Sequence, residues 1–290
     1  MKIKNALLSG LLLCLVVGAQ ANAPQPESQR HNYILFFEIL DYTREMGDAV
    51  SFFLTQVLEP GDQLIIYSPV RVYGFSRATL AQPKKDLVRS VQDKLRGDTA
   101  FCRTNYQVIM DDMKIQVREV ADNISSQEDL KRSLSMYRQS LASLQSLRKV
   151  NEDLLRQVVG VFKANPGKNH AVMVFQAEFR PIPDKETMNR LRAMPIISFE
   201  ANELFAETDQ KPPFDAGAFS ALFKEVPITL DFFYIKPKDV SMAQDIKEQS
   251  VDMYSVFSQM ATATGGILQT TANPEAAFKE LLRRLNAPAQ

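Results

Sequence analysis

Apolar residues form short runs of strand length that alternate with helical patterns along most of the chain. Nearly continuous apolar runs are typical of central parallel strands, which are buried on both faces. Six segments fit a strand: Tyr33–Ile39, Gln63–Ser68, Val70–Phe75, Ala171–Phe175, Ile228–Ile235 and Ile267–Thr270. Because helical patterns separate most of them, the sequence predicts an α/β fold, with a doubly wound, mainly parallel six-stranded sheet of the Rossmann-like kind.

Capping residues and prolines place the helices around this sheet. Either Asp41 or Thr43 can cap a helix that runs to about Val57. Pro83 begins a helix that we expect to end near Leu95, and Pro274 begins the closing helix, since a proline at a first helical turn loses no hydrogen bond.

The middle of the chain has a different pattern. One apolar stripe runs from Cys102 to Val120, and a second helix carries Leu130, Leu134, Tyr137, Leu141 and Leu144 at coiled-coil spacing. We therefore expect a long antiparallel α-helical hairpin, inserted at about 100–164, whose outer half projects with polar outer faces. The segment 181–213 is expected over the edge of the sheet where the carboxyl ends of the strands and their loops lie, which is where such sheets bind ligands. It either covers this edge or takes part in recognition there.

The start of the chain resembles an export signal. Lys2 and Lys4 precede a mostly apolar stretch, and Ala19-Gln20-Ala21 offers a small-x-small cleavage site. This predicts a signal peptide at 1–21, a flexible leader at 22–30 and a domain at 31–290. We expect an exported protein, either periplasmic or secreted, without a membrane span, since no later segment is apolar for ~18 residues.

Charge and composition exclude several function classes. Lys plus Arg equals Asp plus Glu at 34 each, so no basic excess points to nucleic acid. With two Cys and two His, a zinc finger, an iron–sulfur cluster and a disulfide framework are excluded. The chain contains no Walker loop and no Gly-x-Ser-x-Gly, so nothing argues for an enzyme.

Three short motifs occur in an informative order. Pro60-Gly61-Asp62 forms a turn before the second strand, Gly97-Asp98-Thr99-Ala100-Phe101 follows the third strand, and Ala261-Thr-Ala-Thr264-Gly265-Gly266 precedes the last strand. Together with the order of elements, they resemble the von Willebrand factor type A (VWFA) domain family, over about His31 to Leu285. The resemblance implies that family's α/β fold and ligand binding at the top loops.

The family's metal-ion-dependent adhesion site holds Mg²⁺ through an Asp and two Ser of the first loop, a Thr of the second and an Asp of the third. By resemblance Thr99 takes the position of the second-loop Thr, and either Glu38 or Asp41 takes the position of the first-loop Asp. If Asp41 takes it, Thr43 replaces one of the two Ser residues of the first loop. Glu178 is the residue nearest to the position of the third-loop Asp. The site is degenerate, since longer Glu side chains crowd a rigid Mg²⁺ shell. The alternative is structural: Asp41 and Thr43 cap a helix, and Glu38 ends a strand.

The function expected from these observations is an exported, non-enzymatic binding module that resembles a VWFA domain and holds a protein partner through its top loops or its helical hairpin. Its binding residues are expected in the top loops, at Glu38, Asp41, Thr43, Thr99 and Glu178, without a working metal site and without a cofactor. An Mg²⁺-dependent adhesion or ligand-binding VWFA domain is the alternative, and an enzyme of unknown type is a remote one. The sequence leaves the oligomeric state open.

Overall fold

The computed structural model describes residues 30–147, 152–164, 167–205, 215–237 and 245–287. The expected signal peptide (1–21) and nearly all of the expected leader (22–30) lie outside the described residues, so both remain predictions. Among the described helices, none combines the length and the apolar character that crossing a membrane requires.

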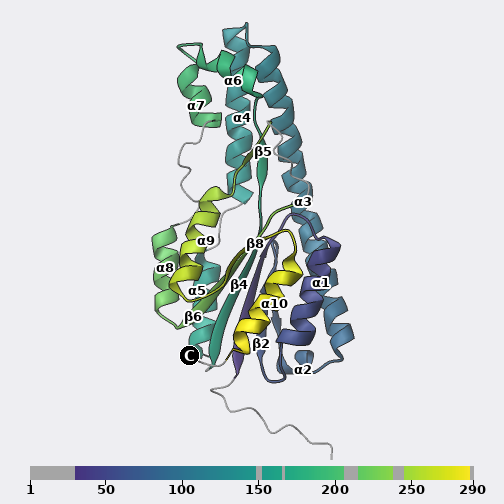
Figure 1. The fold of residues 1–290 in the computed structure, drawn as a ribbon. Coiled ribbons are helices and arrows are strands. Elements are labelled where there is room, and N and C mark those ends of the chain that lie inside the picture. The colour runs from purple at the N-terminus through teal and green to yellow at the C-terminus, as the bar shows by residue number, and fades with distance from the viewer. Residues whose placement is uncertain (1–29, 148–151, 165–166, 206–214, 238–244, 288–290) are drawn as a thin grey trace, which may run out of the picture.

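A six-stranded sheet forms the centre of the molecule, in the order β3-β2-β1-β4-β6-β8 (Figure 1). Neighbouring strands pair in parallel, except for the edge pair β2–β3, which is antiparallel. This confirms the α/β fold with a mostly parallel sheet. The strands are β1 (His31–Glu38), β2 (Gln63–Tyr67), β3 (Val72–Phe75), β4 (Lys168–Gln176), β6 (Ile228–Ile235) and β8 (Leu268–Thr271).

Strand β1 shows why its sequence is an apolar run. Tyr33, Leu35 and Phe37 pack on one face of the sheet. Ile34 and Phe36 pack on the opposite face. Successive side chains of a strand point to opposite faces, so a strand covered by helices on both sides needs apolar residues at every position.

Helices cover both faces of the sheet. The Tyr33 face is covered by α1 (Arg44–Phe52), its π-helical continuation η2 (Phe53–Val57), the first turns of α3 (Lys84–Asp122) and α10 (Pro274–Leu285). The Ile34 face is covered by α5 (Glu152–Ala164), α8 (Ala216–Lys224) and α9 (Val251–Ala263). A short helix, α2 (Arg77–Leu80), precedes α3.

Helix α3 (Lys84–Asp122) is one uninterrupted helix of 39 residues, which corrects the predicted end near Leu95 and the predicted loop at Thr99. Its first turns pack Leu87 and Val91 on the sheet, and its last turns pack Met113 and Val120 in a separate core. A glycine inside a helix, here Gly97, disfavours it by only about 1 kcal/mol, and packing on both sides offsets that amount. At 1.5 Å per residue α3 reaches about 58 Å.

Helix α4 (Gln127–Leu147) packs along the distal half of α3 (Figure 1). Its coiled-coil residues, among them Leu134 and Tyr137, are all buried. Beyond residues 148–151, which are not described, α5 packs Val159 and Phe162 on the sheet. This fits a hairpin of which only the outer half projects, and its predicted bounds at about 100–164 stay a prediction.

The segment after β4 lies on this helix pair and not over the sheet edge, which corrects its predicted place. Helices α6 (Lys185–Arg192) and α7 (Ser198–Phe205) bury Met188, Leu191 and Leu204 against α3 and α4. The outer faces of the pair are therefore only partly free. We call residues 101–147 and 182–205 the helical arm; residues 206–213 of the segment are not among those described.

A two-stranded antiparallel ribbon joins the sheet edge to the arm. It consists of β5 (Phe179–Pro181) and β7 (Ile246–Glu248). The hydroxyl of Tyr106 donates to the Phe179 carbonyl at 3.0 Å, and the hydroxyl of Tyr137 donates to the Pro181 carbonyl at 2.8 Å. These bonds fix the arm to the ribbon, since a buried Tyr hydroxyl needs a partner.

Candidate functional site

The carboxyl ends of the parallel strands form one edge of the sheet, with the change of strand order between β1 and β4. In open α/β sheets ligands bind at such a point, because the loops on either side diverge. Gln176 at the end of β4 accepts hydrogen bonds from the backbone of Leu40 at 2.9 Å and of Asp41 at 2.8 Å. The loop after β1 is thereby fastened to β4.

Glu38 and Glu178 lie close to each other at this edge. Glu38 ends β1 and is exposed at the end of the strand. Desolvation by the protein around its carboxylate, followed by the charge of Glu178, raises the pKa of Glu38 to about 7. The Glu178 side chain is buried, and its backbone N–H donates to Ser250 Oγ at 3.1 Å. Two of the five predicted residues therefore interact.

Thr99 is buried inside α3 rather than in a loop, and its hydroxyl has no hydrogen-bond partner within the described parts of the chain. The preceding residue, Asp98, is also buried, and it accepts hydrogen bonds from Ser68 Oγ at 2.5 Å and from the Tyr73 hydroxyl at 2.7 Å. Asp98 thus fastens α3 to the end of β2. Asp98 is not among the predicted site residues, although an Asp between the apolar helix positions Leu95 and Cys102 is a signal visible in the sequence.

Asp41 and Thr43 have structural partners of their own. The Asp41 carboxylate forms an ion pair of 2.6 Å with Arg103 of α3. Thr43 Oγ1 accepts from the backbone N–H of Met46 at 3.2 Å and caps α1. This is the structural alternative for Thr43, since Ser and Thr at that position satisfy an open helical N–H.

These contacts test the oxygen set that the family resemblance implies for Mg²⁺. A rigid octahedral shell needs several oxygens free to converge on one point. Asp41 is engaged by Arg103, Thr43 is engaged by the helix cap, and Thr99 projects from a helix. Among the described residues, no three or more His, Cys, Asp or Glu side chains gather as a metal would require. The residues present do not fit that site.

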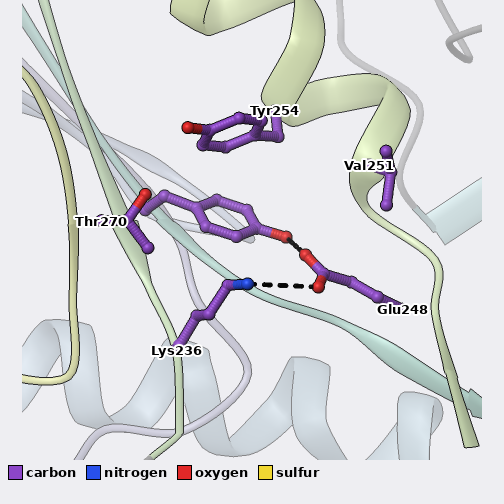
Figure 2. A pocket seen from close by; sticks show the side chains of 6 residues that line it. Lys236, Glu248, Val251, Tyr254 and Thr270 are labelled. Carbon is purple, nitrogen blue, oxygen red and sulfur yellow. Dashed lines mark hydrogen bonds and ion pairs between the residues drawn. The ribbon is translucent and has the colours of Figure 1, made fainter.

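A pocket of about 280 Å³ lies at the same edge, at the ends of β6 and β8 (Figure 2). Figure 2 shows Lys236 and Glu248 directed toward each other, with Tyr254 and Val251 on α9 and Thr270 on β8 around them. Tyr234 completes the lining. No sequence pattern indicates a role for these residues, because they converge only where Glu248 of β7 meets the end of β6.

A chain of hydrogen bonds connects this pocket to Glu178. The Tyr234 hydroxyl donates to Glu248 Oε1 and lies 2.6 Å from Ser250 Oγ, which also accepts the Glu178 N–H. Because the phenol has a single hydrogen, Ser250 is the donor in its contact with Tyr234. Burial, followed by the bond to Glu248, raises the pKa of Tyr234, so this phenol acts as a hydrogen-bond donor and not as a base.

Comparison of the chain with models of protein families, with curated proteins and with solved structures finds no match.

Proposed function

We propose that the chain is an exported, non-enzymatic binding module that resembles a VWFA domain and holds a protein partner through the helical arm. The observation that carries this proposal is a stripe on α3 made of Phe101, Val108 and Ile115, which are 63%, 59% and 53% exposed. Residues seven apart lie on nearly the same face of a helix, so the stripe extends over about 21 Å.

The exposed polar residues Asn105 and Asp112 lie on the same face between these side chains, so the stripe is an interrupted row of exposed apolar groups on one side of α3. We take its regular spacing, rather than single exposed residues, which are normal, as the support for an interaction site. The tip of the arm adds Ile196 and Phe199, both strongly exposed. Asp112 lies within the stripe, between Val108 and Ile115, and other charged residues such as Lys114 occupy the remaining exposed faces of this part of α3. Apolar residues at a seven-residue spacing, with polar residues between them, suit a partner helix laid along α3.

The test is capture of a partner from the exported fraction of the source cells with the immobilised chain. Val108→Glu places a charge in the middle of the stripe, and we expect it to abolish capture while the melting transition stays in place. The matched control is Gln107→Glu, which adds the same charge at the adjacent exposed position. Equal capture by both variants would move the binding surface away from α3.

Mg²⁺-dependent ligand binding at the sheet edge is the second candidate. The observation in its favour is the interaction between the Glu38 and Glu178 carboxylates at the sheet edge. Capture of the partner in excess EDTA separates the candidates, because a metal-dependent contact is lost there and an apolar contact along α3 is retained.

A further inference from the structure

The pocket at the ends of β6 and β8 combines one cation, one anion and an aromatic wall in a volume of about 280 Å³. Its lining contains none of the stripe residues on α3 and none of the predicted site residues. This volume is at the small end of ligand sites, which usually measure about 300–1,000 Å³. The pocket therefore suits a molecule of amino-acid size and is too small for a nucleotide.

The anion of the pocket is held rigidly. Glu248 Oε1 accepts from the Tyr234 hydroxyl, and that hydroxyl is positioned by Ser250 at the start of α9. Tyr234 and Ser250 are both buried. Because these partners fix one oxygen of Glu248, the second oxygen, Oε2, faces the pocket with a defined direction.

The cation is held more loosely. Lys236 Nζ lies 3.4 Å from Glu248 Oε2, longer than the 2.7–2.9 Å of a strong charge-assisted bond, and the Lys236 side chain is 48% exposed. An ammonium has three donors, of which this long contact engages one weakly, and the Nζ also lies over the Tyr234 ring, 5.8 Å from its centroid. The pair can thus open toward a ligand at little loss.

The remaining lining supplies groups for both ends of a dipolar ligand. Thr270 on β8 and Tyr254 on α9 also line the pocket, and Figure 2 shows the Tyr254 ring on the side away from Lys236. The Tyr254 and Tyr234 ring centroids are 4.9 Å apart in an edge-to-face arrangement. The face of an aromatic ring attracts ammonium groups, and Val251 adds an apolar wall beside it.

We propose that this pocket binds a small zwitterion, an α-amino acid with a short side chain. Its carboxylate contacts Lys236 and Thr270, its ammonium contacts Glu248 Oε2 and the Tyr254 ring, and its side chain lies against Val251. A simple anion would be repelled by Glu248 and a simple cation by Lys236, so both charges on one molecule are needed.

The experiment is calorimetric titration of the chain with L-alanine. Two analogues serve as tests of the charges: N-acetyl-L-alanine lacks the ammonium, and L-alaninamide lacks the carboxylate. We expect saturable binding of L-alanine with a Kd of about 1 mM or tighter and at least about tenfold weaker binding of each analogue. No saturation up to about 10 mM, or equal binding of all three compounds, would overturn the proposal.

Variants assign the binding to this pocket. Lys236→Gln and Glu248→Gln are each expected to weaken L-alanine binding at least about tenfold. The control is Lys279→Gln, which removes the same charge from the exposed 2.8 Å pair with Glu275 on α10. Lys236 is half exposed, so its replacement leaves the fold intact, and a thermal melt verifies this. Unchanged binding in Lys236→Gln would refute the assignment.

Discussion

Arg284 of α10 forms a two-pronged ion pair with Asp231 in the middle of β6. Arg284 Nη2 lies 2.8 Å from Asp231 Oδ2, and Nη1 contacts Oδ1. Asp231 is fully buried and also accepts the backbone N–H of Ile267 at 2.8 Å. One carboxylate thus ties together the closing helix, a central strand and the approach to β8.

Removing the arginine is expected to destabilise the whole sheet. Arg284→Met leaves the Asp231 carboxylate buried without its counter-charge, which lowers the free energy of unfolding by about 3–5 kcal/mol. Denaturant unfolding followed by circular dichroism measures the change. The double variant Arg284→Met with Asp231→Leu is expected to regain part of this loss, because it removes both charges. Lys279→Met, in an exposed pair, should change stability by less than about 1 kcal/mol; an equal effect of the two Met substitutions would contradict a buried pair.

The arm has its own core, separate from the two faces of the sheet. Leu134 is fully buried there, and Leu134→Ala is expected to lower the free energy of unfolding by about 2–5 kcal/mol. Met136, two residues away and 42% exposed, provides the control, since Met136→Ala removes little buried surface. Hydrogen exchange should show that Leu134→Ala weakens protection in α4 and α6 more than in β4. Uniform loss of protection would mean that arm and sheet unfold as one unit.

Deleting the hairpin is expected to make the chain insoluble. Replacing 105–145 with a Gly-Ser linker removes the surface on which α6 and α7 bury Met188, Leu191 and Leu204. Exposing this apolar set creates an aggregation-prone patch. Sedimentation of the expressed variant tests the expectation, and a soluble, cooperatively folding product would show that α6 and α7 can find another surface.

Acidification is expected to destabilise the chain through His170. The His170 ring is buried and lies 2.9 Å from the His31 ring, Nε2 to Nδ1; burial, followed by the charge of His31, lowers its pKa to about 3. The folded state therefore binds fewer protons than the unfolded state between about pH 3 and pH 6.5. The free energy of unfolding falls as the pH drops through that range, by a few kcal/mol, as expected from the difference between the two pKa values of His170.

The measurement compares unfolding of wild type and His170→Gln from pH 7 to pH 4. The difference between them isolates His170, because Asp62, whose pKa burial raises to about 6, acts in the opposite direction in both proteins. A group with a raised acidic pKa stabilises the fold toward low pH, whereas His170 does the reverse. Parallel pH profiles of the two proteins would exclude a contribution from His170.

Divalent metal is expected to leave the melting transition unchanged. Melts in EDTA and in excess Mg²⁺ should coincide, whereas an ion at about 100 times its Kd would add ~2.7 kcal/mol. Thr99→Val should also be nearly neutral, because it replaces a buried hydroxyl that lacks a partner in the described chain by an apolar group of similar shape. An Mg²⁺-induced rise in melting temperature that disappears in Thr99→Val would restore the metal-dependent alternative.

The sequence by itself determined the sheet and most of its helices. Continuous apolar runs such as β1 and β6 indicate strands buried on two faces, and Thr43 and Pro274 indicate where helices begin. These signals are visible in the sequence because they depend only on neighbours along the chain. The local pattern also identified Leu130–Leu144 as a buried helical stripe, since a single face of α4 carries it.

Only the tertiary structure decided where these elements meet. Gly97 suggests a loop in the sequence, but packing of α3 on the sheet at one end and on α4 at the other keeps the helix continuous through it. No sequence signal places the segment after β4 on the arm. The pair Arg284–Asp231 and the pocket around Tyr234 and Glu248 join residues far apart in the chain. Such contacts follow from how strands are ordered in the sheet, and local periodicity contains no information about that order.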